Sequence, residues 1–369
     1  MSCQRPVLIP TRPGTSVRAR LHDVIAFIEN MTCMLVIVGP FAVTVPRTAL
    51  VCRSTAPICR PATKDFRQSR IARTVSSMLT LHNLTHIYPN GTRALDVVTL
   101  SIPRGMYGLL GPNGAGKSTL MRTIATLQTP TQGTVRFADI DVIAEPEKLR
   151  RTLGYLPQDF GVYPRVSAYD MLDHMAVLKG VASSADRKLT VETLLQQTNL
   201  WSVRKKMLAS FSGGMRQRFG IAQALIGNPQ LIIVDEPTAG LDPEERNRFL
   251  NLLAEIGEQV VVILSTHIVE DVSDLCQRMA VMAAGRVQLE GSPQDLIQSM
   301  QGRVWRKTID RGELARYRER YEILSTRLSA GRTVVHVLAD TDPGDGFSPV
   351  DATMQDVYFS TLAETRRAA

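Results

Sequence analysis

The spacing of apolar residues predicts an α/β protein from residue 78 onward. Residues 78–88 alternate apolar and polar positions, as a half-buried strand does. The runs "LIIVDE" (231–236) and "VVVILS" (260–265) are instead continuously apolar over most of their length, which is typical of strands buried on both faces of a parallel sheet. Residues 167–225 carry helical spacing almost throughout, so we expect a helical insertion between the strands.

The other segments extend this pattern. A second strand is expected in "LDVVTLSI", a helix over residues 118–127, and a hairpin around Ala284-Gly285. From about residue 300 the pattern predicts strand, helix, hairpin and helix, with "TDPGDGFSP" as a loop. We therefore divide the chain into residues 1–77, a main domain over 78–299 with a helical subdomain at about 159–226, and a small α+β region over 300–369.

Charge is distributed unevenly between these parts. The chain of 369 residues has a net charge of +8, but residues 1–77 hold 11 Lys/Arg against 3 Asp/Glu, whereas residues 78–369 hold 32 of each. Residues 78–369 are therefore neutral overall, and this balance argues against a nucleic-acid partner.

The first 77 residues also differ in other ways. They contain four of the five cysteines, at spacings that match no common zinc or disulfide framework, and they show no sustained helical or strand period. The apolar stretch Met31–Val45 is shorter than a membrane span and contains Gly39-Pro40. We expect residues 1–77 to be disordered or not to be made, with translation starting at Met78; the alternative is a membrane anchor at Met31–Val45.

A phosphate-binding loop, "GPNGAGKST", follows the apolar run 106–110 and precedes the helix expected at 118–127. Its glycines allow successive N–H groups to surround an anion, and the helix presents its positive end to the same place. The lysine supplies charge to the outer phosphates, and the serine hydroxyl can bind the accompanying Mg²⁺. The loop consists of Gly111, Pro112, Asn113, Gly114, Ala115, Gly116, Lys117, Ser118 and Thr119.

Two carboxylates at the end of a buried strand indicate that the bound phosphate is hydrolysed. Asp235 can hold Mg²⁺, directly or through water, while Glu236 can orient or deprotonate an attacking water.

A second phosphate-binding arrangement stands in "SFSGGMRQRFGIAQAL", where Ser212-Gly213-Gly214 begins a helix. One chain does not need two such sites for one triphosphate. We therefore expect two copies to face each other, each completing the nucleotide site of the other.

With these motifs, the sequence resembles the ATP-binding cassette (ABC) family, specifically the nucleotide-binding subunit of a membrane transporter. The resemblance covers residues 78–299 and implies a P-loop NTPase cassette with a mainly parallel core sheet, an antiparallel β subdomain and a helical subdomain. It implies an ATPase that uses ATP and Mg²⁺, dimerises with a second cassette and drives transport through integral membrane permease subunits at the cytoplasmic face of the inner membrane.

The resemblance also assigns roles to single residues. Gly111–Thr119 matches the Walker A loop, residues 231–235 match Walker B, and Phe211–Met215 matches the family signature. Glu236 corresponds to the catalytic base. Further matches are the adenine-stacking Tyr88, the γ-phosphate-sensing glutamine and Mg²⁺ ligand Gln158, the dimer-crossing Asp242, and the switch histidine His267.

The signature departs from the family pattern Leu-Ser-Gly-Gly-Gln at both ends, with Phe211 and Met215. Met215 lacks the hydrogen-bonding groups of a glutamine amide, which affects the expected hydrolysis rate more than the function. "SGGMRQR" and "MQDVYF" are similar to cassettes of the drug, polysaccharide and antibiotic exporter branch, which favours export.

The alternative is a cassette ATPase that acts on nucleic acid or ribosomes. The translation-factor type carries two cassettes, whereas this sequence has one phosphate loop, and the distance from Lys117 to Ser212 is too short for the coiled coil of the chromosome-binding type. A nucleotide kinase would give no role to Ser212-Gly213-Gly214.

Overall fold

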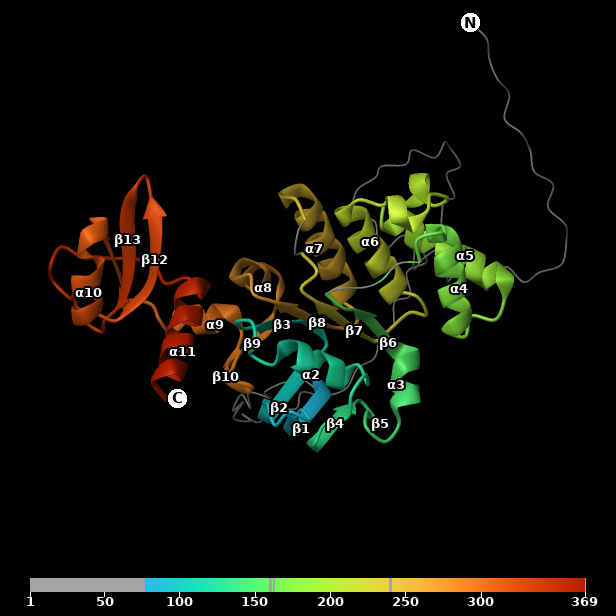
Figure 1. Cartoon of the computed structure of the whole chain (residues 1–369), viewed down its shortest axis with the longest axis horizontal. Coiled ribbons are helices and arrows are strands. Elements are labelled where there is room, and N and C mark those ends of the chain that lie inside the picture. Colours follow the sequence, from blue (N-terminus) through green and yellow to red (C-terminus); the bar gives the residue numbers. More distant parts are fainter. Residues whose placement is uncertain (1–76, 159–160, 162, 239–240, 369) are drawn as a thin grey trace, which may run out of the picture. The chain divides into compact units, whose positions relative to one another are not determined.

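The computed structural model describes residues 77–368, except residues 159, 160, 162, 239 and 240 (Figure 1). The expectations for the N-terminal 77 residues lie outside this range, apart from Ser77. Within the described residues, no helix is both long enough and apolar enough to cross a bilayer.

The central element is a six-stranded sheet of order β10-β9-β3-β8-β7-β6. Its strands are parallel except for the antiparallel hairpin β9–β10. Every residue of β3, β7 and β8 is buried, which explains why these runs are continuously apolar. The strands are β3 (Gly105–Leu110), β6 (Leu153–Leu156), β7 (Leu231–Asp235), β8 (Val261–Thr266), β9 (Arg278–Ala283) and β10 (Arg286–Gly291).

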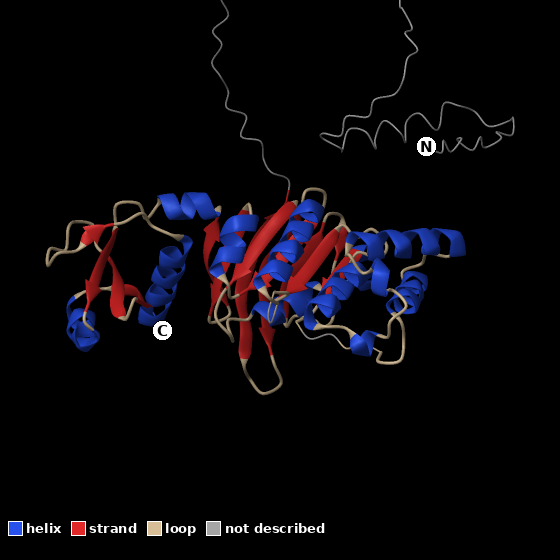
Figure 2. Ribbon diagram, turned by 90° about the horizontal axis from the view of Figure 1, so that it is seen from above, coloured by secondary structure: helices blue, strands red, loops and turns tan. Residues whose placement is uncertain are grey.

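Successive side chains of the central strands point to opposite faces, and each face has its own hydrophobic cluster. Met106 and Leu110 of β3 join the cluster of helices α7 (Pro243–Gly257), α8 (Val269–Leu275) and α9 (Pro293–Gln298). Tyr107 and Leu109 join the opposite cluster, which contains α2 (Lys117–Ile124). Figure 2 shows helices lying against these strands. The expected mainly parallel core sheet is confirmed.

An antiparallel sheet packs in the same cluster as α2. Its order is β2-β1-β4-β5. Strand β2 contains the expected second strand "LDVVTLSI", and buried and exposed residues alternate along most of it. The expected antiparallel β subdomain is confirmed. Its strands are β1 (Ser77–Ile87), β2 (Arg93–Pro103), β4 (Gln132–Phe137) and β5 (Ile140–Asp141).

The segment with helical spacing forms three helices around a separate hydrophobic cluster. Each helix is capped by a serine side chain that accepts a hydrogen bond from the backbone N–H three residues later. The elements here are α4 (Ala168–Leu178), α5 (Ser184–Gln197), α6 (Gly213–Ala224) and the 3₁₀ turns η1 (Trp201–Val203) and η2 (Leu208–Ser210). Helix α3 (Pro146–Thr152) precedes β6; the spacing analysis identified neither element.

The C-terminal region follows the predicted order of strand, helix, hairpin and helix, with one correction. Two residues of the expected loop "TDPGDGFSP", Ser348 and Pro349, form the edge strand β14 and pair with β11. A proline fits there because an edge strand leaves one row of N–H positions unpaired. The elements are β11 (Val304–Ile309), η3 (Arg311–Glu313), α10 (Leu314–Arg320), β12 (Ile323–Ser329), β13 (Arg332–Leu338), β14 (Ser348–Pro349) and α11 (Met354–Ala368).

Candidate active site

The phosphate loop connects β3 to α2. Gly116 has φ 102°, and a Cβ at this position would lie 2.5 Å from the carbonyl oxygen of Ala94, so both the backbone angle and the space require glycine. Gly116 is also the N-cap of α2 and provides no side-chain cap. The first N–H groups of the helix therefore stay available to an anion.

Lys117 is 5% exposed and folds back over the loop. Its Nζ donates to the carbonyl oxygens of Gly111 at 2.6 Å and Pro112 at 3.2 Å, and lies 4.0 Å from Glu236 Oε1. Burial lowers the pKa of Lys117, although Glu236 and Asp235 oppose that effect. A buried cation bonded mainly to carbonyl oxygens can exchange those partners for phosphate oxygens.

Most of the residues predicted to bind nucleotide line one cavity of about 620 Å³ beside this loop. This volume is within the range of small-molecule sites. The lining residues are Tyr88, Thr92, Arg93, Ala94, Asn113, Gly114, Ala115, Gly116, Lys117, Ser118, Thr119, Gln158, Glu236, Ala284 and Gly285.

Glu236 receives polar contacts from separate segments of the chain. It follows β7 directly, and its carboxylate Oε2 accepts a hydrogen bond from Gln158 Nε2 at 3.2 Å. His267 Nδ1 lies 3.3 Å from Oε1 of the same carboxylate, and Lys117 Nζ lies 4.0 Å from that oxygen. The side chain of Glu236 is 12% exposed. A carboxylate held in this way, at the wall of the cavity beside the phosphate loop, can accept a proton from water.

Asp235 is 4% exposed and has different surroundings from its neighbour Glu236. Its Oδ1 is buried with no hydrogen-bond partner among the described residues, and the same holds for Ser265 Oγ on the paired position of β8. A buried oxygen without a partner is uncommon and fits an ion or water as the missing partner. One carboxylate, the Ser118 hydroxyl and phosphate oxygens form the kind of oxygen-rich set that Mg²⁺ prefers.

Tyr88 is another lining residue of the cavity. Its hydroxyl is 3.1 Å from Thr119 Oγ1, and its ring meets His86 edge-on, with centroids 4.7 Å apart. These contacts hold the ring beside the phosphate loop.

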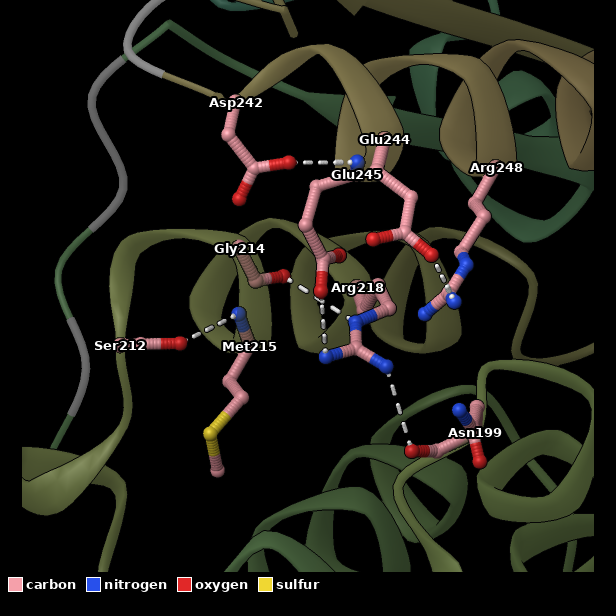
Figure 3. Close-up of polar contacts among 9 residues, drawn as sticks. All are labelled: Asn199, Ser212, Gly214, Met215, Arg218, Asp242, Glu244, Glu245 and Arg248. Carbon is pink, nitrogen blue, oxygen red and sulfur yellow. Dashed lines mark hydrogen bonds and ion pairs between the residues drawn. The ribbon is translucent and has the colours of Figure 1, made fainter.

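The structure does not place Ser212, Gly213, Gly214 or Asp242 on this cavity. Ser212 caps α6 through a bond from Met215 N at 3.3 Å, and Asp242 caps α7 through a bond from Glu245 N at 2.8 Å (Figure 3). Ser212 and Gly213 are exposed. The phosphate loop and the predicted second phosphate-binding segment at Ser212-Gly213-Gly214 are thus separate in one chain.

Ala284-Gly285 was predicted as a hairpin turn. The sequence did not predict that this turn lines the nucleotide cavity. Gly285 N donates to Ala115 O at 3.1 Å, and Asp96 N donates to Gly285 O at 2.9 Å. A Cβ on Gly285 would lie 2.9 Å from Ala94 O. No motif marks this contact, because it joins segments far apart in the chain.

Comparison with known proteins places this geometry in a family. Residues 95–239 match the model of the ABC transporter family. The chain is 35% identical over 286 residues to the daunorubicin/doxorubicin resistance ATP-binding protein DrrA of Streptomyces peucetius, covering 77% of this chain and 83% of that protein. It is 37% identical over 224 residues to the methionine import ATP-binding protein MetN 1 of Burkholderia ambifaria, covering 58% of this chain and 65% of that protein.

A solved structure gives the same result for the fold. A dimeric ATP-binding cassette in a post-hydrolysis state, bound to ADP and phosphate, superposes with a TM-score of 0.53 at 29% identity. The match covers 58% of this chain and 98% of the solved chain. The chain therefore belongs to the ATP-binding cassette family and is the ATP-binding, ATP-hydrolysing subunit of a membrane transporter.

Proposed function

We propose that Glu236 is the general base that activates water for attack on the γ-phosphate of ATP, and that Gln158 and His267 position it. The observation that carries this proposal is the approach of Gln158 and His267, from two different segments, to one carboxylate at the wall of the phosphate-loop cavity. Because Gln158 and His267 lie beside Glu236, both would also be close enough to the terminal phosphate to respond to its presence. Lys117 would stabilise the charge of the outer phosphates.

Mg²⁺ belongs to the same proposal, with Ser118, Asp235 and Gln158 as the protein ligands. The bound ion supplies charge neutralisation on the phosphates. The unpartnered Oδ1 of Asp235 supports this assignment, because a buried carboxylate oxygen without a partner is costly. Tyr88 would stack on the adenine ring, and the backbone of Gly111–Thr119 would surround the phosphates.

The hydrolytic unit would be a dimer in which each cassette completes the site of the other. The exposed start of α6, at Ser212-Gly213-Gly214, would contact the nucleotide bound by the partner's phosphate loop, and Asp242 would lie at the same interface. The separation of these residues from the chain's own phosphate-loop cavity supports this arrangement, as does the dimeric state of the similar solved cassette.

The permease would dock on a groove of about 440 Å³ between α2, α3, β6, α4 and α6. Leu127 and Leu178 line it and are 62% and 72% exposed, which is unusual for two leucines on one concave surface. Gly154 and Tyr155 of β6, the strand that leads to Gln158, also line the groove. A permease segment in this groove would therefore press on the segment that contacts Glu236.

Export from the cytoplasmic face of the inner membrane is the direction we propose. The match to a drug-resistance protein, which covers 77% of this chain, supports it. The test is to co-express the chain with the membrane protein encoded beside its gene, reconstitute the complex in lipid vesicles, and add ATP on the cassette side. Export predicts that a labelled drug moves from the cassette side into the lumen. ATP-dependent movement in the opposite direction would show an importer.

A further inference from the structure

Two ion pairs start from consecutive residues of α7 and reach two different helices. Glu245 Oε1 pairs with Arg218 Nη2 of α6 at 3.2 Å, and Arg246 Nη2 pairs with Asp271 Oδ1 of α8 at 2.6 Å. The side chains of Arg218 and Glu245 are only 16% and 22% exposed, and that of Asp271 is fully buried. The side chain of Arg246 is 31% exposed. Both pairs are therefore partly shielded between helices, where screening by water is weaker than at a fully exposed pair.

The first pair connects α7 to the helix that begins at the signature residues (Figure 3). Arg218 also donates to the carbonyl oxygen of Gly214 at 3.4 Å, and the carboxyl group of Glu245 occupies the space beside that glycine. A Cβ on Gly214 would lie 3.1 Å from the Glu245 carboxyl group. A shift of the signature turn would therefore move the start of α7.

The second pair connects α7 to the helix that follows the switch histidine. Asp271 lies four residues after His267, and Arg246 reaches it with Nε at 2.9 Å as well as with Nη2. The other oxygen of Asp271 accepts a bond from Thr238 Oγ1 at 3.0 Å, and Thr238 lies two residues after Glu236. One buried carboxylate thus joins α7 to the segments that carry Glu236 and His267.

We propose that Arg218–Glu245 and Arg246–Asp271 act through α7 as one linkage by which the signature helix sets the positions of Glu236 and His267. The inference rests on the roles proposed above for these two residues. In a dimer with shared sites, Ser212 contacts the partner's ATP, whereas Glu236 and His267 serve the chain's own ATP. The linkage therefore couples the occupancy of one ATP site to the positions of the catalytic residues in the other. Its four side chains are positioning residues, because none lines the nucleotide cavity.

The test is a double-mutant cycle on ATP turnover with Glu245→Ala, Asp271→Asn and the combination of both. Each single change should lower kcat by roughly 10-fold or more while nucleotide affinity changes less than about 2-fold, since misplaced catalytic groups slow chemistry without removing binding groups. Because either change breaks the same linkage, the combination should lower kcat no further than the more severe single change. If the fold-decrease in kcat of the double variant equals the product of the two single fold-decreases, the pairs act independently, and the proposal is overturned.

Glu244→Ala is the matched control. Glu244 pairs with Arg248 on the same helix, but their side chains are 76% and 55% exposed, so kcat should change less than about 2-fold. Exchanging the charges, with Arg218→Glu combined with Glu245→Arg, should recover part of the turnover if the pair itself matters. Unchanged turnover in Glu245→Ala, or turnover loss that only follows a lower melting temperature in all variants, would overturn the linkage.

Glu236→Gln is measured alongside to separate this inference from the proposed function. Full turnover in Glu236→Gln would refute the role of the base, whatever the linkage variants show. Lost turnover in Glu236→Gln together with a normal rate in both linkage variants would refute the linkage alone.

Discussion

Glu236 has φ 48°, in the left-handed region that residues with a Cβ seldom adopt. Its N–H donates to Ser265 O at 2.9 Å, so the strained conformation is held by the neighbouring strand β8. Strain of this kind is typical of functional sites, where surrounding structure maintains it. The two adjacent carboxylates differ in their surroundings. The Oδ1 atom of Asp235 is buried without a hydrogen-bond partner among the described residues, whereas Glu236 lines the cavity and contacts Gln158, His267 and Lys117.

This geometry makes a direct prediction for Glu236→Gln. The amide keeps the size of the side chain and a hydrogen-bonding oxygen but cannot accept a proton from water, so phosphate release should fall at least ~100-fold. ATP affinity should stay near that of the wild type, because the phosphate loop is intact. ATP should then hold the variant as a stable dimer, which size-exclusion chromatography detects. Near-normal phosphate release from purified variant would refute the assignment.

At the scale of elements, the groove proposed to dock the permease shares no lining residue with the nucleotide cavity. Leu178 lies at the end of α4 and touches no residue proposed to bind nucleotide. Leu178→Asp should weaken permease association because a carboxylate would be buried against an apolar segment, and the lost contact corresponds to roughly 10-fold or more in affinity. ATP turnover of the isolated cassette should be unchanged. Co-purification with the permease and a turnover assay provide the two measurements.

Leu189→Asp is the matched control for that variant. Leu189 is also a leucine on a helix of the same subdomain, and it is 67% exposed, but it lies outside the groove. It should leave permease association unchanged. Equal loss of association in both variants would place the docking surface elsewhere.

Helix α11 is held against the C-terminal sheet by a buried pair. Asp356 is 1% exposed, and its Oδ1 lies 2.8 Å from His336 Nδ1 of β13. Burial would raise the pKa of Asp356, but the bonds from His336 and Thr353 outweigh it and lower the pKa below its ordinary value. A lowered pKa in the folded state means that ionised Asp356 stabilises the fold above the ordinary carboxyl pKa. This stability is lost as the pH falls through the lowered value.

Asp356→Asn should therefore lower the free energy of unfolding of the C-terminal region at pH 7 by about 1–3 kcal/mol, the cost of leaving buried partners poorly bonded. The difference from the wild type should shrink as the pH falls from the ordinary carboxyl pKa through the lowered pKa of Asp356. Thermal melts across pH, followed by circular dichroism, measure both effects. The control is Asp340→Asn, because the Arg303–Asp340 pair is largely exposed and should contribute little. A loss that does not depend on pH would contradict this account.

Features that depend on local sequence pattern were predicted, whereas features that depend on contacts between distant residues were mostly not. The continuous apolar runs identified β7 and β8 because strands buried on both faces have no polar positions. Strand β6 was not predicted because it has only four residues, and its burial depends on pairing with β7. The bond from Gln158 to Glu236 joins residues 78 positions apart. The carboxylates at the end of a buried strand pointed to Glu236, whereas only the resemblance to a family pointed to Gln158. The close contact of Gly285 with Ala115 had no sequence signal at all.

For the whole molecule, the proposed shared site makes each chain depend on a second cassette. The cavity beside the phosphate loop contains Lys117 but not Ser212, and Ser212 stands exposed at the start of α6. Lys117→Ala should therefore weaken nucleotide binding by the monomer, whereas Ser212→Ala should leave it intact and reduce ATP-driven dimerisation. Equilibrium binding of a fluorescent ATP analogue to dilute protein distinguishes the two effects.

Mixing the two variants tests the shared site itself. With Glu236→Gln also present in both chains to prevent turnover, neither variant alone can build a complete ATP site, so neither should dimerise with ATP. In the mixture, the intact phosphate loop of the Ser212→Ala chain can face the intact signature of the Lys117→Ala chain, which gives one complete site per mixed dimer. About half of randomly paired dimers are mixed, so ATP should produce a dimer peak that both separate samples lack. If Ser212 instead served its own chain's nucleotide, every chain in the mixture would carry a defective site, and no dimer peak would appear.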